Sequence, residues 1–447
     1  MRIPVHAVGI AATTSASTTI STAAAANDCS SAFGILADLL IPGRGDPVSK
    51  AALVVKDSAI DWVGREDDIP ADYSSLHFSR VHVLMPGMWD VHTHFMGSNI
   101  VGSLQDSFTQ FLPGMPALIG AVTVDDLRAT LMAGFTSVRE LGGYAGDVYP
   151  AVEAGAIVGP HVYSSMSVLS ITGGHGDQHD VPLATVLDAC SRGTPFALCD
   201  GVEGCTRAVR QVIRRGAKVI KICSTGGVLS LNDEPEDSQF SPAELVAIVE
   251  EAARSGRVVA AHAIGKNGIM AALDAGVKSI EHGMYLDEEV AAKMKEKDAI
   301  LVPTRHIVEG LAAGAEDLAP VTRVKMERML QLSRDSLKLA VKLGVRIALG
   351  TDTFSSDRKH RIAHGKNAKE LQYAVDAGMS PLRAIEMATA VPPETLGRQA
   401  RKAGQLKRGY DADMIAISKN PLGDIEILTK PDNVTHVWKG GVLYKTP

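Results

Sequence analysis

The sequence has few cysteines and no long apolar run. Its five cysteines are few for 447 residues and form no CxxC pair, so we expect reduced, mostly buried thiols rather than a disulfide framework. Gly, Pro or charged residues interrupt every apolar stretch before it reaches the ~18 residues of a membrane-spanning helix. The sequence therefore predicts a soluble protein that does not cross a membrane.

Long blocks of one charge are also missing. The net charge is -6 and the sequence pI is about 6.2, which removes the electrostatic argument for nucleic acid or an anionic membrane as the main partner. Aromatic residues make up only 4% of the chain, yet 45% of it is hydrophobic. Such a chain can bury a large core, and we expect its partner to be a small molecule.

The N-terminal stretch has too little apolar sequence for a convincing signal peptide. Residues 10–26 are almost entirely Ala, Ser and Thr, and Arg2 is the one basic residue before them. We interpret 1–31 as a flexible tail. Cytoplasmic and secreted locations both remain open.

Two β-rich ends flank a different middle. Residues 32–84 and 403–447 show short apolar runs separated by turn residues, which predicts a small β-sandwich domain built from both ends. Between them, over 85–402, strand-like runs alternate with helical patterns, so we expect an α/β fold with a (β/α)8 TIM barrel. The eight strand candidates are Val83–Val91, Phe135–Arg139, His161–Ser164, Ala217–Cys223, Val258–His262, Ser279–His282, Ile300–Thr304 and Arg346–Thr351.

Several predicted helices have clear start or end signals in the sequence. Ser241-Pro242-Ala243-Glu244 is a capping box with proline at the first helical position. Ser380-Pro381 predicts another helix start, and Ala319-Pro320 precedes a long helix that ends near Gly344. The irregular stretch Asp177–Gly204 predicts a long loop over the barrel mouth.

Metal-ligating residue types stand at the ends of five predicted strands. The stretch Asp90-Val91-His92-Thr93-His94 places two imidazoles on one face of a strand. A single residue of this kind is more often a structural histidine, a lysine paired with a buried acid, or a helix-capping aspartate. Because the carboxyl ends of barrel strands form one rim, we expect six such side chains to converge: His92, His94, Lys221, His262, His282 and Asp352.

This pattern resembles the metal-dependent amidohydrolase superfamily. Gly173-Gly174-His175-Gly176 and Lys221-Ile222-Cys223-Ser224-Thr225-Gly226-Gly227 are similar to its prolidase-like and imidazolonepropionase-like branch. Within that branch, Leu39-Leu40-Ile41-Pro42-Gly43 and Val434-Thr435-His436-Val437-Trp438 look like the fungal ochratoxinases. The resemblance covers almost the whole chain from about residue 32 and implies amide hydrolysis.

The resemblance also implies a binuclear zinc site. One zinc ion would take His92, His94 and Asp352, and the other His262 and His282. Lys221 would bridge both as a carbamate, since an ammonium repels metals whereas a carbamate is an anion with two oxygens. Two metals would activate a water and polarise the carbonyl, while Asp352 would carry the proton to the leaving amine. We further expect a homo-oligomer.

The substrate contacts are less determined than the metal ligands. His175 is predicted to contact the substrate carbonyl or carboxylate, with a structural loop histidine as the alternative. Arg139 and Tyr144 are predicted to bind a substrate carboxylate, although an arginine there more often orders loops. Ile264 stands where ochratoxinases carry a polar or aromatic residue, which makes that wall apolar.

The expected reaction is that of an amidase or carboxypeptidase. Its substrate would be an N-acyl amino acid or dipeptide-like amide with a free carboxylate, such as ochratoxin A, which yields ochratoxin alpha and phenylalanine. The alternatives are an Xaa-Pro-type dipeptidase and a cyclic-amide, imidazolone-like hydrolase. A non-enzymatic barrel protein is the remaining interpretation, and the complete ligand set disfavours it.

Overall fold

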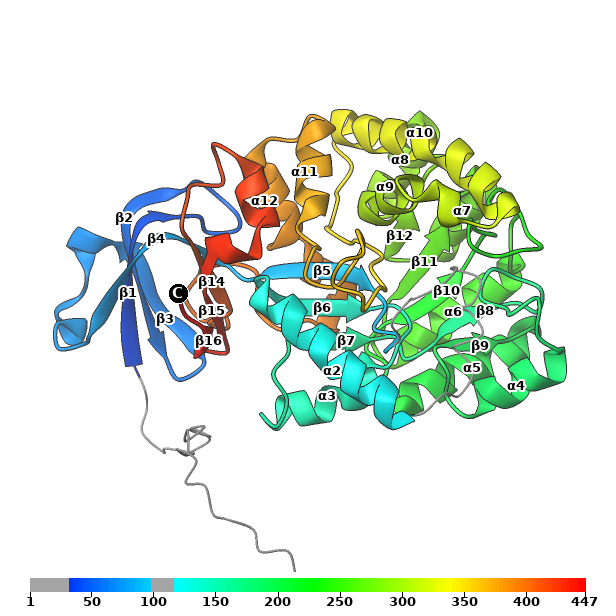
Figure 1. Ribbon diagram of the computed structural model, residues 1–447, viewed down its shortest axis with the longest axis horizontal. Coiled ribbons are helices and arrows are strands. Elements are labelled where there is room, and N and C mark those ends of the chain that lie inside the picture. The colour runs from blue at the N-terminus through cyan, green and yellow to red at the C-terminus, as the bar shows by residue number, and fades with distance from the viewer. Residues whose placement is uncertain (1–31, 98–115) are drawn as a thin grey trace, which may run out of the picture.

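Both ends of the described chain contribute strands to one sheet at one end of the molecule (Figure 1). The computed structural model describes residues 32–97 and 116–447, so the predicted tail 1–31 lies outside the described residues. The strands of this terminal sheet are β1 (Ala32–Leu40), β2 (Val48–Lys56), β3 (Ala59–Arg65), β4 (Phe78–Pro86), β14 (Met414–Ile417), β15 (Val434–Lys439) and β16 (Val442–Lys445).

Hydrogen bonds join all the terminal strands into one sheet, and its arrangement as the expected β-sandwich stays a prediction. Its order is β16-β15-β14-β4-β1-β2-β3. β4 pairs parallel with β1 and antiparallel with β14, so backbone hydrogen bonds join the N-terminal and C-terminal strands edge to edge. Since β4 ends at Pro86, it also crosses the expected boundary between 84 and 85.

Parallel strands form the second part of the molecule. A three-stranded sheet contains β5 (Met88–Thr93), β6 (Phe135–Glu140) and β7 (His161–Ser164). A six-stranded sheet has the order β13-β12-β11-β10-β8-β9. Its strands are β8 (Val168–Ser170), β9 (Phe196–Leu198), β10 (Ile220–Cys223), β11 (Val259–Ala263), β12 (Ser279–His282) and β13 (Ile300–Val302).

Backbone hydrogen bonds link these two sheets at both sides. At one side, Lys218 N donates to Ser164 O at 2.8 Å. At the other, Leu301 N donates to Arg346 O and Val91 N donates to Leu349 O, each at 2.9 Å. The expected eighth strand, 346–351, is therefore present as a connecting segment with one bridge at Ile347, not as a strand.

The first expected barrel strand, Val83–Val91, is divided between two sheets. β4 ends at Pro86, and β5 begins at Met88 in the other sheet. A Cβ atom on the intervening Gly87 would lie 2.1 Å from Thr136 Oγ1, so only glycine fits beside β6. The sequence did not predict this boundary between β4 and β5, because both strands are buried where they meet and the residues there form one continuous apolar run.

Helices cover the parallel strands (Figure 1). The capping box at Ser241 is confirmed, as are the helix starts at Pro381 and Pro320 and the left-handed Gly344 after the long helix. The α-helices are α2 (Pro116–Met132), α3 (Ala145–Glu153), α4 (Leu183–Ser191), α5 (Gly201–Arg215), α6 (Pro242–Arg254), α7 (Lys266–Ala275), α8 (Glu288–Glu296), α9 (Arg305–Ala312), α10 (Pro320–Leu343), α11 (Lys369–Asp376) and α12 (Pro381–Ala388).

The stretch expected as a long loop, Asp177–Gly204, is partly regular. It contains α4 and β9, and α5 begins within it at Gly201. Short 3-10 helices occupy other connections: η1 (Glu66–Asp68), η2 (Ala71–Tyr73), η3 (Ala315–Asp317), η4 (Pro392–Gln399), η5 (Ile425–Thr429) and η6 (Pro431–Asn433). Among the described residues, no helix has both the length and the apolar character needed to cross a membrane.

Candidate active site

The six predicted ligand residues converge at the carboxyl ends of the parallel strands. Four of them lie in β5, β10, β11 and β12, one in each strand. The other two directly follow β5 and the segment 346–351. All six line one cavity of about 970 Å³, a volume that includes space open to solvent. They are His92, His94, Lys221, His262, His282 and Asp352.

Asp352 lies against two histidines in this cluster. Its Oδ1 atom is 3.1 Å from His94 Nε2 and 3.5 Å from His92 Nε2. Lys221 Nζ is 3.4 Å from His92 Nε2. Ligand atoms of His92, His282 and Asp352 lie within 4.8 Å of one another, so His282, which the resemblance assigns to the second ion, lies close to two candidate ligands of the first.

Partners outside the cluster hold one ring nitrogen of His92 and one of His94. His92 Nδ1 is 2.8 Å from Glu281 Oε2, and His94 Nδ1 donates to Gly142 O at 2.7 Å. A ring that donates through Nδ1 keeps its lone pair on Nε2. In both histidines Nε2 is also the atom that faces Asp352.

The other two histidines are held in the same way. His282 Nδ1 lies 2.7 Å from Thr304 Oγ1, while His262 Nε2 donates to Gly226 O at 2.9 Å. Metal-binding histidines commonly have their second nitrogen fixed by such a partner, which sets both tautomer and ring orientation. The donor set therefore fits divalent metal ions.

Burial makes these side chains suitable ligands. It lowers the pKa values of His92, His262 and His282 well below the usual range, which keeps the rings neutral. Burial also lowers the pKa of Lys221. For Asp352 burial raises the pKa, but the neighbouring His92 and His94 outweigh it and the net shift is downward, so the carboxylate persists.

Two candidate ligands have unusual backbone conformations. His282 has a φ of 73° and Asp352 a φ of 59°, a left-handed region that non-glycine residues seldom adopt. Asp90 anchors the second turn, because its carboxylate accepts from Thr351 N at 3.1 Å and from Thr351 Oγ1 at 2.5 Å. Such strained positions concentrate at functional sites.

Arg139 does not line the cavity, so its predicted contact with substrate is corrected. Its side chain is fully buried, and its donors bond to Val91 O at 2.5 Å, Ser279 Oγ at 2.9 Å and Glu281 Oε1 at 2.7 Å. Glu281 in turn contacts His92. Arg139 therefore supports the candidate ligand His92 through Glu281.

Of the remaining predicted contacts, two line the cavity and one does not. Ile264 and His175 line the cavity, whereas Tyr144 stands at the N-terminus of α3 and is not among the lining residues. The ring of His175 stacks on His262 with centroids 4.2 Å apart. Burial lowers the pKa of His175 to about 4.

The cavity walls are mainly apolar. Apart from Lys221, no lysine or arginine lines the cavity within the described part of the chain, and residues 98–115 contain neither. A large uncharged group therefore fits these walls better than a carboxylate does. The apolar lining residues include Val228, Leu229, Ile264, Met284, Ile307, Val308, Leu311, Met326 and Phe354.

Sequence reasoning missed the partners that orient the ligands. Glu281 carried a usable signal, since it is a charged residue inside the buried strand β12 directly before His282. Thr304, and the carbonyl groups of Gly142 and Gly226, carried none. Their roles come from contacts between elements that are distant in sequence.

Comparisons with known proteins agree with this geometry. The amidohydrolase family model matches residues 83–443. The chain is 47% identical to ochratoxinase of Aspergillus niger over 426 residues, which covers 92% of this chain and 86% of that protein. The crystal structure of A. niger ochratoxinase superposes with a TM-score of 0.87 and 46% identity, covering 94% of this chain and 97% of that one.

Relatives with lower sequence identity are named for other activities. A crystal structure of a Xaa-Pro dipeptidase with bound methionine in its active site has a TM-score of 0.81 and 30% identity, covering 93% of this chain and all of that one. Imidazolonepropionase of Paraburkholderia phymatum is 25% identical over 331 residues, which covers 69% of this chain and 74% of that protein. By its sequence match and its fold, the chain belongs to the amidohydrolase family and is a hydrolase of amide bonds.

Proposed function

We propose that the protein is a zinc-dependent amidase or carboxypeptidase with two zinc ions per chain. One observation carries the proposal: each of four histidines has one ring nitrogen fixed by a partner outside the cluster, which leaves its second nitrogen as the candidate metal ligand. His92, His94 and Asp352 would hold one ion, His262 and His282 the other, and a carbamylated Lys221 would bridge them. The lowered pKa of Lys221 supports carbamate formation, because a neutral amine reacts with carbon dioxide.

The proposal includes a closed barrel around this centre. The segment 346–353 hydrogen-bonds to β13 on one side and to β5 on the other. Such a segment in the eighth position would complete the ring of strands. It would also bring Asp352 beside His92 and His94.

Different residues of the chain would have different roles in hydrolysis. Divalent metals held here would supply an activated water and polarise the scissile carbonyl. Asp352, within 3.1 Å of His94 Nε2, would take the proton from the attacking water and pass it to the leaving amine. The apolar walls would bind the bulky part of the substrate and exclude water.

The proposed substrates are N-acyl amino acids or dipeptide-like amides, with ochratoxin A as a candidate. The names of the ochratoxinase relatives favour this class. The names of other relatives keep two alternatives, an Xaa-Pro-type dipeptidase and a cyclic-amide, imidazolone-like hydrolase. The expected free carboxylate has no arginine partner in the described wall, so it would face the metals or the open mouth.

A substrate panel tests the proposal. Zinc-loaded protein and Lys221→Ala are assayed on ochratoxin A, its carboxamide derivative, an Xaa-Pro dipeptide and a cyclic amide. We expect the wild type to hydrolyse ochratoxin A with the highest kcat/KM and Lys221→Ala to hydrolyse nothing. Preferential cleavage of the proline dipeptide or the cyclic amide would select the corresponding alternative, and full activity of Lys221→Ala would refute the metal site.

A further inference from the structure

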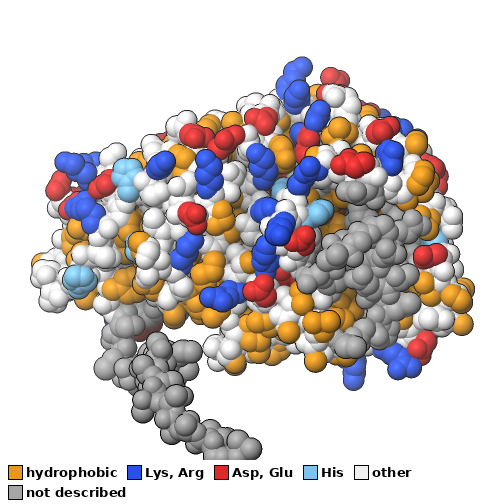
Figure 2. All heavy atoms as spheres, viewed as in Figure 1, with side chains coloured by type: hydrophobic (Ala, Val, Ile, Leu, Met, Phe, Trp, Pro, Cys, Tyr) orange, Lys and Arg blue, Asp and Glu red, His pale blue; other side chains and the backbone are white. Residues whose placement is uncertain are grey.

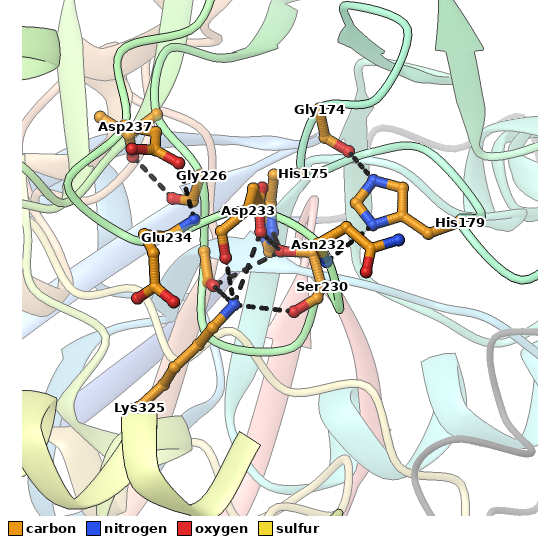
Figure 3. Close-up of polar contacts among 12 residues, drawn as sticks. Gly174, His175, His179, Gly226, Ser230, Asn232, Asp233, Glu234, Asp237 and Lys325 are labelled. Atoms are coloured by element: carbon orange, nitrogen blue, oxygen red, sulfur yellow. Dashed lines mark hydrogen bonds and ion pairs between the residues drawn. The ribbon is translucent and has the colours of Figure 1, made fainter. Parts of the chain in front are cut away.

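A buried lysine organises the loop that follows β10. Lys325 lies on α10, and only 3% of its side chain is exposed. Its ammonium group donates to Gly227 O at 3.2 Å, to Ser230 O at 2.9 Å and to Asp233 O (Figure 3). A buried ammonium is costly unless all its hydrogens are used. Here three carbonyl groups of one loop accept them.

The same loop holds His175 by both its ring and its backbone. His175 Nδ1 is 2.8 Å from Ser230 Oγ, and His175 N donates to Gln239 Oε1 at 3.0 Å. Ser230 Oγ also forms a short hydrogen bond with Asp233 Oδ1, while Gln239 Nε2 donates to Asp233 Oδ2 at 3.0 Å. Asp233 therefore links the two groups that hold His175.

Counting hydrogens in this network assigns the tautomer of His175. A carboxylate only accepts, so the single hydroxyl hydrogen of Ser230 goes to Asp233 Oδ1, which is much nearer than the other acceptor, Gly227 O at 3.4 Å. Ser230 Oγ must then accept from His175, which places the ring hydrogen on Nδ1. A neutral imidazole has one N–H, so Nε2 carries a lone pair, and it has no hydrogen-bond partner among the described residues.

Two neighbours fix the plane of the ring. One face stacks on His262 at an interplanar angle of 23°. Next to the ring lies Gly227, where an added Cβ atom would stand 2.1 Å from His175 Cε1. The ring therefore has little freedom to turn.

We propose that Ser230 and Asp233 are positioning residues that hold His175 as a hydrogen-bond acceptor in the cavity. His175 Nε2 would then accept the N–H of a secondary amide substrate, and Lys325 would keep the loop in place. The inference rests on the proposed amide hydrolysis and narrows its substrates. Secondary amides would be favoured over tertiary ones such as Xaa-Pro bonds, which lack the N–H.

The first test reads the tautomer without using activity. In zinc-loaded protein with nitrogen-15-labelled histidine, NMR distinguishes Nδ1–H from Nε2–H, and His175→Gln identifies the signal. We expect Nδ1–H in the wild type. Asp233→Asn should populate the Nε2–H form, because an amide can donate to Ser230 and so turn its hydroxyl toward His175. An Nε2–H tautomer in the wild type would overturn the proposal, whether or not the protein hydrolyses amides.

The second test asks whether Ser230 acts through His175. We expect Ser230→Ala to lower kcat/KM on a secondary amide about 10- to 100-fold, and Ser230→Thr to retain most of it. In a His175→Ala background, Ser230→Ala should cause no further loss. Additive losses, or equal losses on an N-methylated amide, would overturn the proposal.

A matched control separates this network from general loop stability. Arg328 also lies on α10 and contacts the same loop at Glu234 and Glu236, at 2.9 and 3.0 Å, but it is 45% exposed and does not touch His175. Arg328→Gln should keep the wild-type tautomer and kcat/KM. If it reproduced the effects of Ser230→Ala, the network would have only a structural role.

Discussion

At the residue scale, the convergence of the six candidate ligands could be predicted from sequence but their orientation could not. His92, Lys221 and Asp352 were found because polar residues at the ends of apolar strands stand out locally. The contact between His92 and Glu281 joins residues 189 positions apart, so no local pattern reports it. The same long-range packing placed Arg139 beneath the site, against the prediction.

Replacing Arg139 tests this correction. Arg139→Met leaves Glu281 as a buried carboxylate without its guanidinium partner, and we expect a loss of about 3–5 kcal/mol in the free energy of unfolding. Arg192→Met, which removes an exposed ion pair, should cost less than about 1 kcal/mol. Denaturant unfolding of zinc-loaded protein measures both. An unchanged stability with a raised KM would restore the substrate-binding role.

A second residue-scale prediction concerns Thr304. Thr304→Val keeps the side-chain shape but removes the oxygen that lies 2.7 Å from His282 Nδ1. We expect the affinity for metal to fall about 10- to 100-fold, because the histidine loses its orienting partner. Competition with a fluorescent zinc chelator measures this affinity. Thr206→Val, at an exposed position of α5, is the control, and equal affinities in all three proteins would contradict the prediction.

At the element scale, local signals predicted helices better than sheet membership. Ser241 and Gly344 mark helix ends through their own backbone and side chain, so a short window of sequence contains the information. The division at Gly87 and the missing strand at 346–351 depend instead on which neighbours pair with each segment. Strand pairing is a long-range property, which is why these two expectations failed.

The junction of α9 and α11 gives a pH-dependent prediction. Glu370 on α11 accepts from Arg305 N at 3.0 Å and His306 N at 2.7 Å at the start of α9. Burial raises its pKa to about 8 from the ordinary 4.5; nearby Asp90 also raises it, while the two backbone donors and the Arg305 side chain lower it. The folded protein keeps this proton to higher pH, so the group's stabilising contribution is complete below pH 4.5 and is lost as the pH rises to about 8.

Glu370→Gln should remove this dependence. Glutamine keeps an acceptor oxygen for the N-terminus of α9 but does not titrate. We therefore expect the Tm of the variant to fall less than that of the wild type between pH 5 and 8, as measured by thermal unfolding, while the exposed substitution Glu203→Gln should follow the wild type. Parallel curves for Glu370→Gln and the wild type would contradict the prediction.

At the scale of the whole molecule, the terminal sheet and the parallel strands belong to one family fold. Figure 2 shows acidic and basic side chains mixed over the described part of one face, without a large region of one sign. The expected small-molecule partner stays a prediction. Assembly into a homo-oligomer stays a prediction.

The metal dependence of amide hydrolysis tests the central claim most directly. Protein stripped with a chelator is titrated with zinc while hydrolysis of ochratoxin A is followed, with Lys221→Ala in parallel. The proposed site predicts no turnover without metal, a rise that stops at two zinc ions per chain, and no recovery in Lys221→Ala. Turnover at the wild-type rate by metal-free protein would contradict it.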